Sequence, residues 1–135
     1  MKVILYQVKS FRWKSWSKTL DHVEDIDVEQ SVQEAVVAFV HAEEADVENP
    51  KVATKLVKNI KWLANKGGFK NVALHSFTHL SSSTAPPHYA VNLLNSVAQR
   101  LEQTGYQVSQ TPFGYFCEWD LSVYGQSLAK VFKEF

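Results

Sequence analysis

Apolar positions along the chain follow two spacings, one typical of strands and one typical of helices. The strand-like segments are rich in β-branched and aromatic side chains. Residues 35–40 are apolar without a break, which indicates a strand buried on both faces. The predicted strands are residues 2–8, 34–42, 70–75 and 115–123, and a further strand begins at residues 107–108.

Two segments carry apolar residues at helical spacing. The first predicted helix begins at Asn49, a good N-cap residue, with Pro50 in the first helical position, and it ends at the glycine pair 67–68. The second predicted helix follows residues 81–87 and ends at Gly105. The apolar positions are Val52, Leu56, Ile60 and Leu63 in the first helix, and Val91, Leu94, Val97, Ala98 and Leu101 in the second.

Three segments have weaker patterns. Residues 11–16 (FRWKSW) alternate apolar and basic side chains, which predicts either the second strand of a hairpin or a basic and aromatic edge. Residues 18–27 are polar and irregular, and residues 128–132 predict a short terminal helix. The order of elements predicts a single α/β or α+β domain over residues 1–135, with two amphipathic helices packed on a sheet.

The composition is that of a soluble globular domain. The chain has 135 residues, of which 45% are hydrophobic and 21% charged. No apolar run approaches the roughly 20 residues of a membrane helix, and the N-terminus lacks a signal-peptide pattern. The single cysteine excludes an internal disulfide, so we expect a cytoplasmic protein. The net charge is 0, so we expect an RNA partner to be bound locally rather than through a large basic surface.

The five histidines form no recognisable metal motif. His75 and His79 lie four residues apart, but the preceding strand argues against a helix that would bring them together. His22, His41 and His88 have no supporting pattern. The sequence also lacks the glycine-rich phosphate-binding motifs, so we expect neither a metal nor a cofactor.

The one cysteine, Cys117, falls within the strand predicted over residues 115–123. A lone cysteine on a strand is more often a small buried hydrophobe than a nucleophile. A nucleophilic role would require a histidine close to it in space.

Two stretches place unusual groups at strand ends. Residues 76–83 (SFTHLSSS) follow a strand and precede a helix, and backbone N–H groups at such a junction can face an anion or a carbonyl oxygen. The alternative is a serine-rich loop that caps the next helix. Residues 111–115 (TPFGY) enter a strand, and here the alternative is an ordinary turn.

Together the two stretches resemble the editing domain at the N-terminus of archaeal threonyl-tRNA synthetases. That family has a strand ending in a short turn with Phe and His, then Leu-Ser-Ser and a helix, and later Pro-Phe-Gly-Tyr entering a strand. The resemblance covers nearly the whole chain, including residues 36–42 and 49–50, and is weakest over residues 9–33. The matching residues are Phe77, His79, Leu80, Ser81, Ser82, Pro112, Phe113, Gly114, Tyr115, Gly125, Leu128 and Ala129.

The resemblance implies a fold like that of D-aminoacyl-tRNA deacylases, and a homodimer. It implies hydrolysis of seryl-tRNA(Thr), with threonyl-tRNA(Thr) spared. A synthetase pocket that accepts threonine rejects serine only weakly, because one methylene is worth about 1–3 kcal/mol. The implied partners are the terminal adenosine of tRNA(Thr) with its serine, and the catalytic and anticodon-binding domains of the synthetase, in the same chain or another. Neither a membrane nor a cofactor is implied.

The resemblance also implies the residues of the site. The turn of residues 76–79 forms one wall, residues 113–117 form the opposite wall, and Ala42 lines the adenosine side. The implied substrate-binding residues are Ala42, Ser76, Phe77, Thr78, Phe113, Gly114 and Tyr115, and the implied catalytic positions are His79, Phe116, Cys117 and Lys130.

Four positions depart from the family pattern. Phe116 and Cys117 stand where the family often has Tyr and Lys, Lys130 stands where it has Glu, and Ser76 where Pro is common. A cation beside an α-ammonium group is unfavourable, so we expect Lys130 to turn away or to meet an RNA oxygen. Either the site is inactive, or main-chain groups and a ribose hydroxyl carry the catalysis.

The sequence leaves other functions open. A D-aminoacyl-tRNA deacylase acting on free substrate would have the same fold. A catalytically inactive module would bind the tRNA 3′ end, or dimerise, without turnover. An unrelated α/β domain is the third alternative. The sequence stops at Phe135 without an ATP-binding or anticodon-binding region, as expected of an excised domain or of a free-standing protein.

Overall fold

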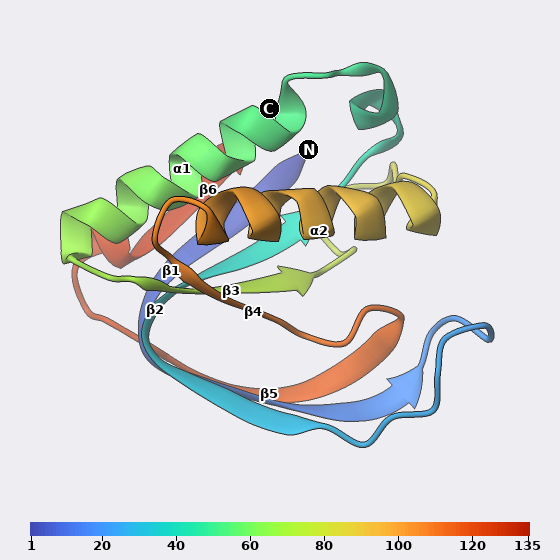
Figure 1. Cartoon of the computed structure of the whole chain (residues 1–135), viewed down its shortest axis with the longest axis horizontal. Coiled ribbons are helices and arrows are strands. Elements are labelled where there is room, and N and C mark those ends of the chain that lie inside the picture. Colours follow the sequence, from blue (N-terminus) through green and yellow to red (C-terminus); the bar gives the residue numbers. More distant parts are fainter.

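The computed structural model describes all 135 residues and shows a curled sheet of six strands with two helices packed on one face (Figure 1). The predicted mixed α+β fold is therefore confirmed, as are the strands predicted over residues 70–75, 107–108 and 115–123. The strands are β1 (Lys2–Lys18), β2 (Glu29–His41), β3 (Asn71–Ser76), β4 (Gln107–Gln110), β5 (Tyr115–Val123) and β6 (Lys130–Glu134). The helices are α1 (Val52–Gly67), α2 (Pro87–Glu102) and two short 3-10 helices, η1 (Glu44–Glu48) and η2 (Ser127–Ala129).

One half of the sheet is parallel and the other half is antiparallel. The strand order is β4-β3-β2-β1-β5, and β6 also pairs with β1. Strands β2, β3 and β4 run parallel, whereas β1 runs antiparallel to β2, β5 and β6. Residues 35–40 of β2 are buried on both faces, as their unbroken apolar run predicts. Val40 pairs with Ser76, so the carboxyl ends of β2 and β3 lie side by side.

Strand β1 is longer than predicted. Residues 11–16 are neither the second strand of a hairpin nor a separate edge, because they continue the strand that begins at Lys2. Phe11 pairs with Val32 of β2 on one side and with Leu121 of β5 on the other. The register between β1 and β5 shifts after Val8, a bulge-like irregularity of the kind that bends a strand. The bend agrees with Figure 1, in which the sheet curls and β5 lies away from the two helices.

The predicted helix over residues 128–132 is wrong. Ser127–Ala129 forms one 3-10 turn, and the chain then continues as strand β6. Strand β5 pairs only with the part of β1 from Val8 onward, which leaves the first residues of β1 with an open edge. Strand β6 fills that edge, from Lys2 opposite Glu134 to Tyr6 opposite Lys130. The long-range pairing therefore outweighs the local helical pattern.

The two helices bury their apolar faces against the sheet, as predicted. Helix α1 begins at Val52 rather than at Asn49, and the Asn49 side chain accepts a hydrogen bond from the backbone N–H of Lys51. It ends as predicted, with Gly68 in the left-handed region at φ 71°. In α2, Val91 is only half-buried, and Leu93 takes a place in the core beside the predicted positions.

A second apolar cluster lies on the face of the sheet that the helices leave free. It contains seven buried residues, three of which are aromatic. The ring centroids of Phe11 and Trp13 lie 5.1 Å apart, and those of Phe39 and Phe77 lie 5.0 Å apart. Phe77 belongs to the turn after β3, so this cluster supports one side of the site described next.

Candidate functional site

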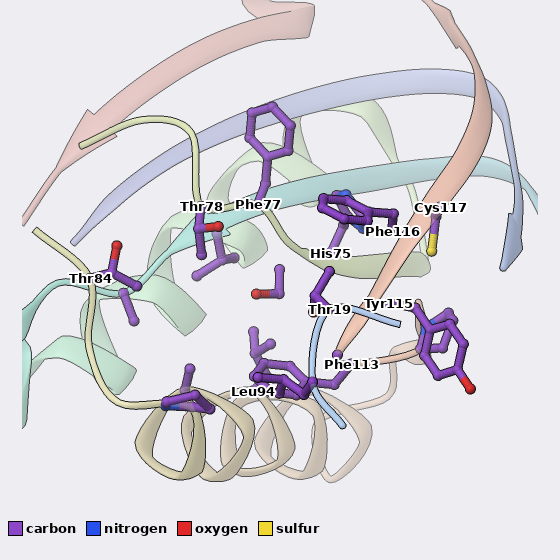
Figure 2. Close-up of a pocket in the computed structure, with 18 of the residues that line it drawn as sticks. Thr19, His75, Phe77, Thr78, Thr84, Leu94, Phe113, Tyr115, Phe116 and Cys117 are labelled. Carbon is purple, nitrogen blue, oxygen red and sulfur yellow. The ribbon is translucent and has the colours of Figure 1, made fainter. Parts of the chain in front are cut away.

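A cavity of about 390 Å³ lies between the end of β3, the start of β5 and helix α2 (Figure 2). Figure 2 shows Phe77 and Thr78 on one side, Tyr115 and Cys117 on another, and Leu94 of α2 along a third. The structure brings together every predicted site residue but one. The predicted residues in the lining are Ala42, Ser76, Phe77, Thr78, His79, Phe113, Gly114, Tyr115, Phe116 and Cys117.

Lys130 is the predicted site residue that does not line the cavity. Its ammonium group donates hydrogen bonds to the backbone carbonyl oxygens of Tyr124, over 3.0 Å, and Gly125, over 3.4 Å. The side chain is thus turned towards its own chain, in line with the expectation that it would turn away. The geometry gives no support to a catalytic role for Lys130.

Several residues that line the cavity were not predicted from the sequence as site residues. Thr19 and Leu20 come from the connection between β1 and β2, a polar segment without periodicity. His75, at the end of β3, lines the cavity, although no motif in the sequence marks it as a site residue. Leu93 and Leu94 come from α2, where the apolar spacing of the helix was the only available indication.

The turn after β3 leaves two adjacent backbone N–H groups without a protein acceptor. Phe77 donates its N–H to the carbonyl oxygen of Val40, and Leu80 donates its N–H to Nδ1 of His41. Between them, the N–H groups of Thr78 and His79 make no hydrogen bond within the chain. Both residues line the cavity and are exposed, so these donors are free for a ligand oxygen.

The opposite wall is supported by residues 19–28. The N–H of Thr19 donates to the carbonyl oxygen of Gly114 over 2.7 Å. The Tyr115 hydroxyl donates to the carbonyl oxygen of Glu24 and accepts from the N–H of Ile26, so it points away from the cavity, as Figure 2 shows. Tyr115 thus presents its ring rather than its hydroxyl to the site.

Gly114 permits this close approach. Its φ is +82°, which favours glycine, and an added Cβ would lie 2.8 Å from Cγ1 of Val23. The Pro-Phe-Gly-Tyr turn and residues 19–28 therefore pack as one unit.

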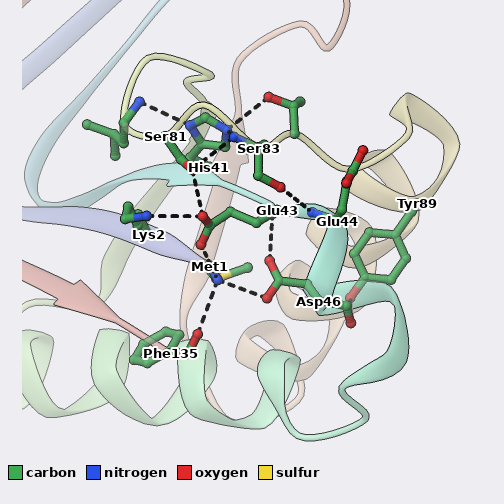
Figure 3. A network of polar contacts seen from close by, with 12 residues as sticks. Met1, Lys2, His41, Glu43, Glu44, Asp46, Ser81, Ser83, Tyr89 and Phe135 are labelled. Atoms are coloured by element: carbon green, nitrogen blue, oxygen red, sulfur yellow. Dashed lines mark hydrogen bonds and ion pairs between the residues drawn. The ribbon is translucent and has the colours of Figure 1, made fainter.

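The loop that leads from the turn to α2 is fixed by polar contacts at the end of β2 (Figure 3). The His41 ring is fully buried; its Nδ1 accepts from Leu80, and its Nε2 donates to the carbonyl oxygen of Ser83 over 2.8 Å. The Glu43 carboxylate accepts from the Ser81 hydroxyl over 2.6 Å and pairs with the ammonium group of Met1 over 2.9 Å. These contacts lower the pKa of Glu43 to about 2, the Ser81 hydrogen bond being the largest cause.

The cavity lining contains no Asp, Glu, Lys or Arg side chain. Burial raises the pKa of the Cys117 thiol, which keeps it protonated and weakens it as a nucleophile. Burial lowers the pKa of His75 to about 4, so its imidazole is neutral at physiological pH. No three His, Cys, Asp or Glu side chains are grouped so that they would hold a metal ion. Neither helix combines the length and apolar character needed to cross a bilayer.

Fold and cavity together define an α+β domain with a cavity that offers aromatic faces and free main-chain donors rather than charged side chains. The model of one family, described as the archaea-specific editing domain of threonyl-tRNA synthetase, matches residues 1–135. The chain belongs to this family.

Curated relatives agree with this assignment. The chain is 32% identical to a threonine–tRNA ligase of Hyperthermus butylicus, with 100% of the chain and 23% of that protein covered. It is 33% identical to the enzyme of Thermococcus onnurineus and 34% identical to that of Methanosphaera stadtmanae, with 97% of the chain and 22% of each relative covered. The chain thus spans less than a quarter of the length of these relatives.

One solved structure has the same fold. It is named c-Myc DNA Unwinding Element Binding Protein and superposes with a TM-score of 0.70, covering 99% of this chain and 98% of that one. The sequence identity is 12%, so the likeness concerns the fold alone. The two chains thus share the same mixed α+β fold over nearly their whole length.

Proposed function

We propose that the chain is a single editing domain that hydrolyses the ester of seryl-tRNA(Thr) and spares threonyl-tRNA(Thr). The observation that carries the proposal is the pair of free N–H groups at Thr78 and His79, two residues that line a cavity of small-ligand size. Ester hydrolysis passes through a developing oxyanion, and paired backbone donors stabilise such a charge well.

The proposed reaction uses water and the substrate's own ribose. The water oxygen attacks the ester carbonyl carbon, and the bond from that carbon to the terminal ribose oxygen breaks. The ribose oxygen takes up a proton, so the products are serine and tRNA with a free terminal hydroxyl. The vicinal ribose hydroxyl orients the water, because the cavity has no carboxylate or lysine that would do so. Among the lining side chains, His79 is the alternative base.

Size is the proposed basis of selectivity. Threonine differs from serine by one methyl group, and a closely fitted cavity excludes a larger ligand more strongly than it rejects a smaller one. The aromatic faces of Phe77 and Phe113 and the Ala42 side chain are the proposed boundaries of the seryl and adenosine positions. The cavity's lack of a cationic side chain suits the α-ammonium group of the seryl ester.

The proposed partners follow from the family. They are the 3′ end of tRNA(Thr), a second copy of the chain in a homodimer, and the catalytic and anticodon-binding domains of a synthetase in the cytoplasm. The relatives are threonine–tRNA ligases more than four times longer than the matched segment, which is consistent with such domains in the same chain or in another.

The test is deacylation of L-seryl-tRNA(Thr) and D-seryl-tRNA(Thr) by the purified chain, followed as release of labelled serine. The proposal predicts release from the L-ester. Release from the D-ester alone would instead assign a D-aminoacyl-tRNA deacylase. Tight binding of the tRNA 3′ end without release from either ester would assign an inactive binding module.

A further inference from the structure

His75 has an unusual place in the cavity. It is the one buried polar side chain in the lining, with 6% of its surface exposed. Its ring packs among aromatic neighbours, with centroid separations of 4.9 Å to Phe39 and 6.0 Å to Phe77. A polar ring thus lies in an otherwise aromatic part of the site, where an unmade hydrogen bond is costly.

Only one nitrogen of the ring has a protein partner. Nδ1 lies 2.8 Å from the hydroxyl oxygen of Thr111, and Nε2 is hydrogen-bonded to no group of the chain. Trp13 Nε1 is the one fully buried side-chain nitrogen or oxygen that lacks a partner. Nε2 of His75 is therefore not sealed within the core. His75 lines the cavity, and Nε2 is the ring nitrogen that is left free to meet a ligand there.

We propose that Nε2 of His75 hydrogen-bonds the side-chain hydroxyl of the seryl group, which makes His75 a further substrate-contacting and specificity-determining residue. The inference rests on the proposed function. Of the hydroxyl groups beside the ester, the ribose hydroxyl is already assigned to the attacking water. The seryl hydroxyl is therefore the one that is still available to hydrogen-bond a side chain of the cavity.

The chemistry of a neutral imidazole fits this ligand. Burial holds the pKa of His75 at about 4, so at neutral pH the ring does not repel the α-ammonium group of the substrate. The Thr111 hydroxyl can either donate to Nδ1 or accept from it, which leaves Nε2 as a donor or an acceptor. A hydroxyl group satisfies both cases, because it donates and accepts. The methyl side chain of alanine, which lacks the hydroxyl, satisfies neither case.

The test compares seryl-tRNA(Thr) with alanyl-tRNA(Thr), which lacks the hydroxyl. Wild type is expected to hydrolyse the seryl ester with the higher kcat/KM, by about tenfold, the worth of one hydrogen bond. The variant His75→Phe keeps an aromatic ring and removes Nε2. It is expected to lose about tenfold on the seryl ester while the alanyl rate stays within about twofold, so the preference disappears. The variant His75→Gln, whose amide both donates and accepts, is expected to restore part of it.

The matched control is His88→Phe, since His88 is exposed and does not line this cavity. It is expected to keep the wild-type ratio. An equal loss on both esters in His75→Phe would overturn the inference and leave the editing function in place. Failure of wild type to hydrolyse either ester would overturn the proposed function and the inference with it.

Imidazole nitrogen NMR of the wild-type chain provides a measurement that does not depend on the folding of a variant. A non-hydrolysable, amide-linked seryl-adenosine is expected to shift the Nε2 resonance of His75, and its alanyl counterpart to leave it in place. Equal shifts with both analogues, or no shift when the seryl analogue binds, would contradict the proposed contact.

Discussion

The hydroxyl of Ser81 donates a hydrogen bond of 2.6 Å to the carboxylate of Glu43. This contact links the end of β2 to the loop that carries the chain from His79 into α2 (Figure 3). Thr84 and Ala85, further along that loop, line the cavity. A partly buried network on one side of the site thus fixes a segment that forms part of its lining.

We expect the Glu43 carboxylate to stabilise the fold in a pH-dependent way. Its pKa in the folded state is about 2, below its ordinary 4.5, so its contribution is present above pH 4.5 and is lost as the pH falls towards 2. Glu43→Gln is expected to lower the free energy of unfolding at pH 7 by about 1–3 kcal/mol and to flatten its acid dependence. Urea unfolding between pH 2 and 7 measures both effects.

Glu44→Gln is the matched control for Glu43→Gln. The Glu44 side chain is exposed and makes no hydrogen bond or ion pair, so its replacement is expected to leave the acid dependence unchanged. Equal curves for the two variants would show that the charge of the Glu43 carboxylate contributes nothing to the acid dependence.

Gly114→Ala is expected to damage the fold and the site together. The residue has φ +82°, and its new Cβ would lie 2.8 Å from Val23. Gly68→Ala is the control, since Gly68 has φ +71° with no atom within 4 Å of the added Cβ. Both variants carry the backbone cost of about 1–2 kcal/mol, and only Gly114→Ala is expected to slow deacylation, by up to about 100-fold. Equal rates for the two variants would argue against a functional turn at Gly114.

Local sequence patterns predict the regular elements well and the contacts between distant segments poorly. In residues 35–40 and in helices α1 and α2, the buried positions are apolar. The spacing of apolar residues in the sequence therefore predicts these elements without knowledge of their neighbours. Residues 128–132 show the opposite case, because the strand there forms only to complete the open edge of β1. Thr19 and Leu20 reach the cavity because their segment folds back on Gly114, a contact that no periodicity reveals.

Cys117 is expected to be dispensable for the chemistry. It lines the cavity, but burial raises the pKa of its thiol and so disfavours the thiolate that a nucleophile needs. Cys117→Ala is expected to retain most of the deacylation rate, and no acyl-enzyme is expected on rapid quenching with labelled seryl-tRNA. A rate loss of several orders of magnitude, or a trapped covalent adduct, would assign the thiol a catalytic role.

The ribose hydroxyl is expected to matter more than the His79 side chain. A general base contributes about 10²–10⁴-fold, so His79→Ala is expected to cost far less than that. A seryl-tRNA whose terminal adenosine lacks the free 2′-hydroxyl is expected to be nearly inert with wild type. Single-turnover rates for both substrates with both proteins test this. An inactive His79→Ala together with unchanged cleavage of the deoxy substrate would assign the base to His79.

The central claim is that the site discriminates between two esters that differ by one methyl group, and hydrolyses only the smaller one. The direct measurement is single-turnover deacylation of a one-to-one mixture of seryl-tRNA(Thr) and threonyl-tRNA(Thr), each with its own label, by the purified 135-residue chain. The account predicts loss of the seryl label while the threonyl label stays on the tRNA. Equal loss of the two labels, or loss of neither, would contradict it.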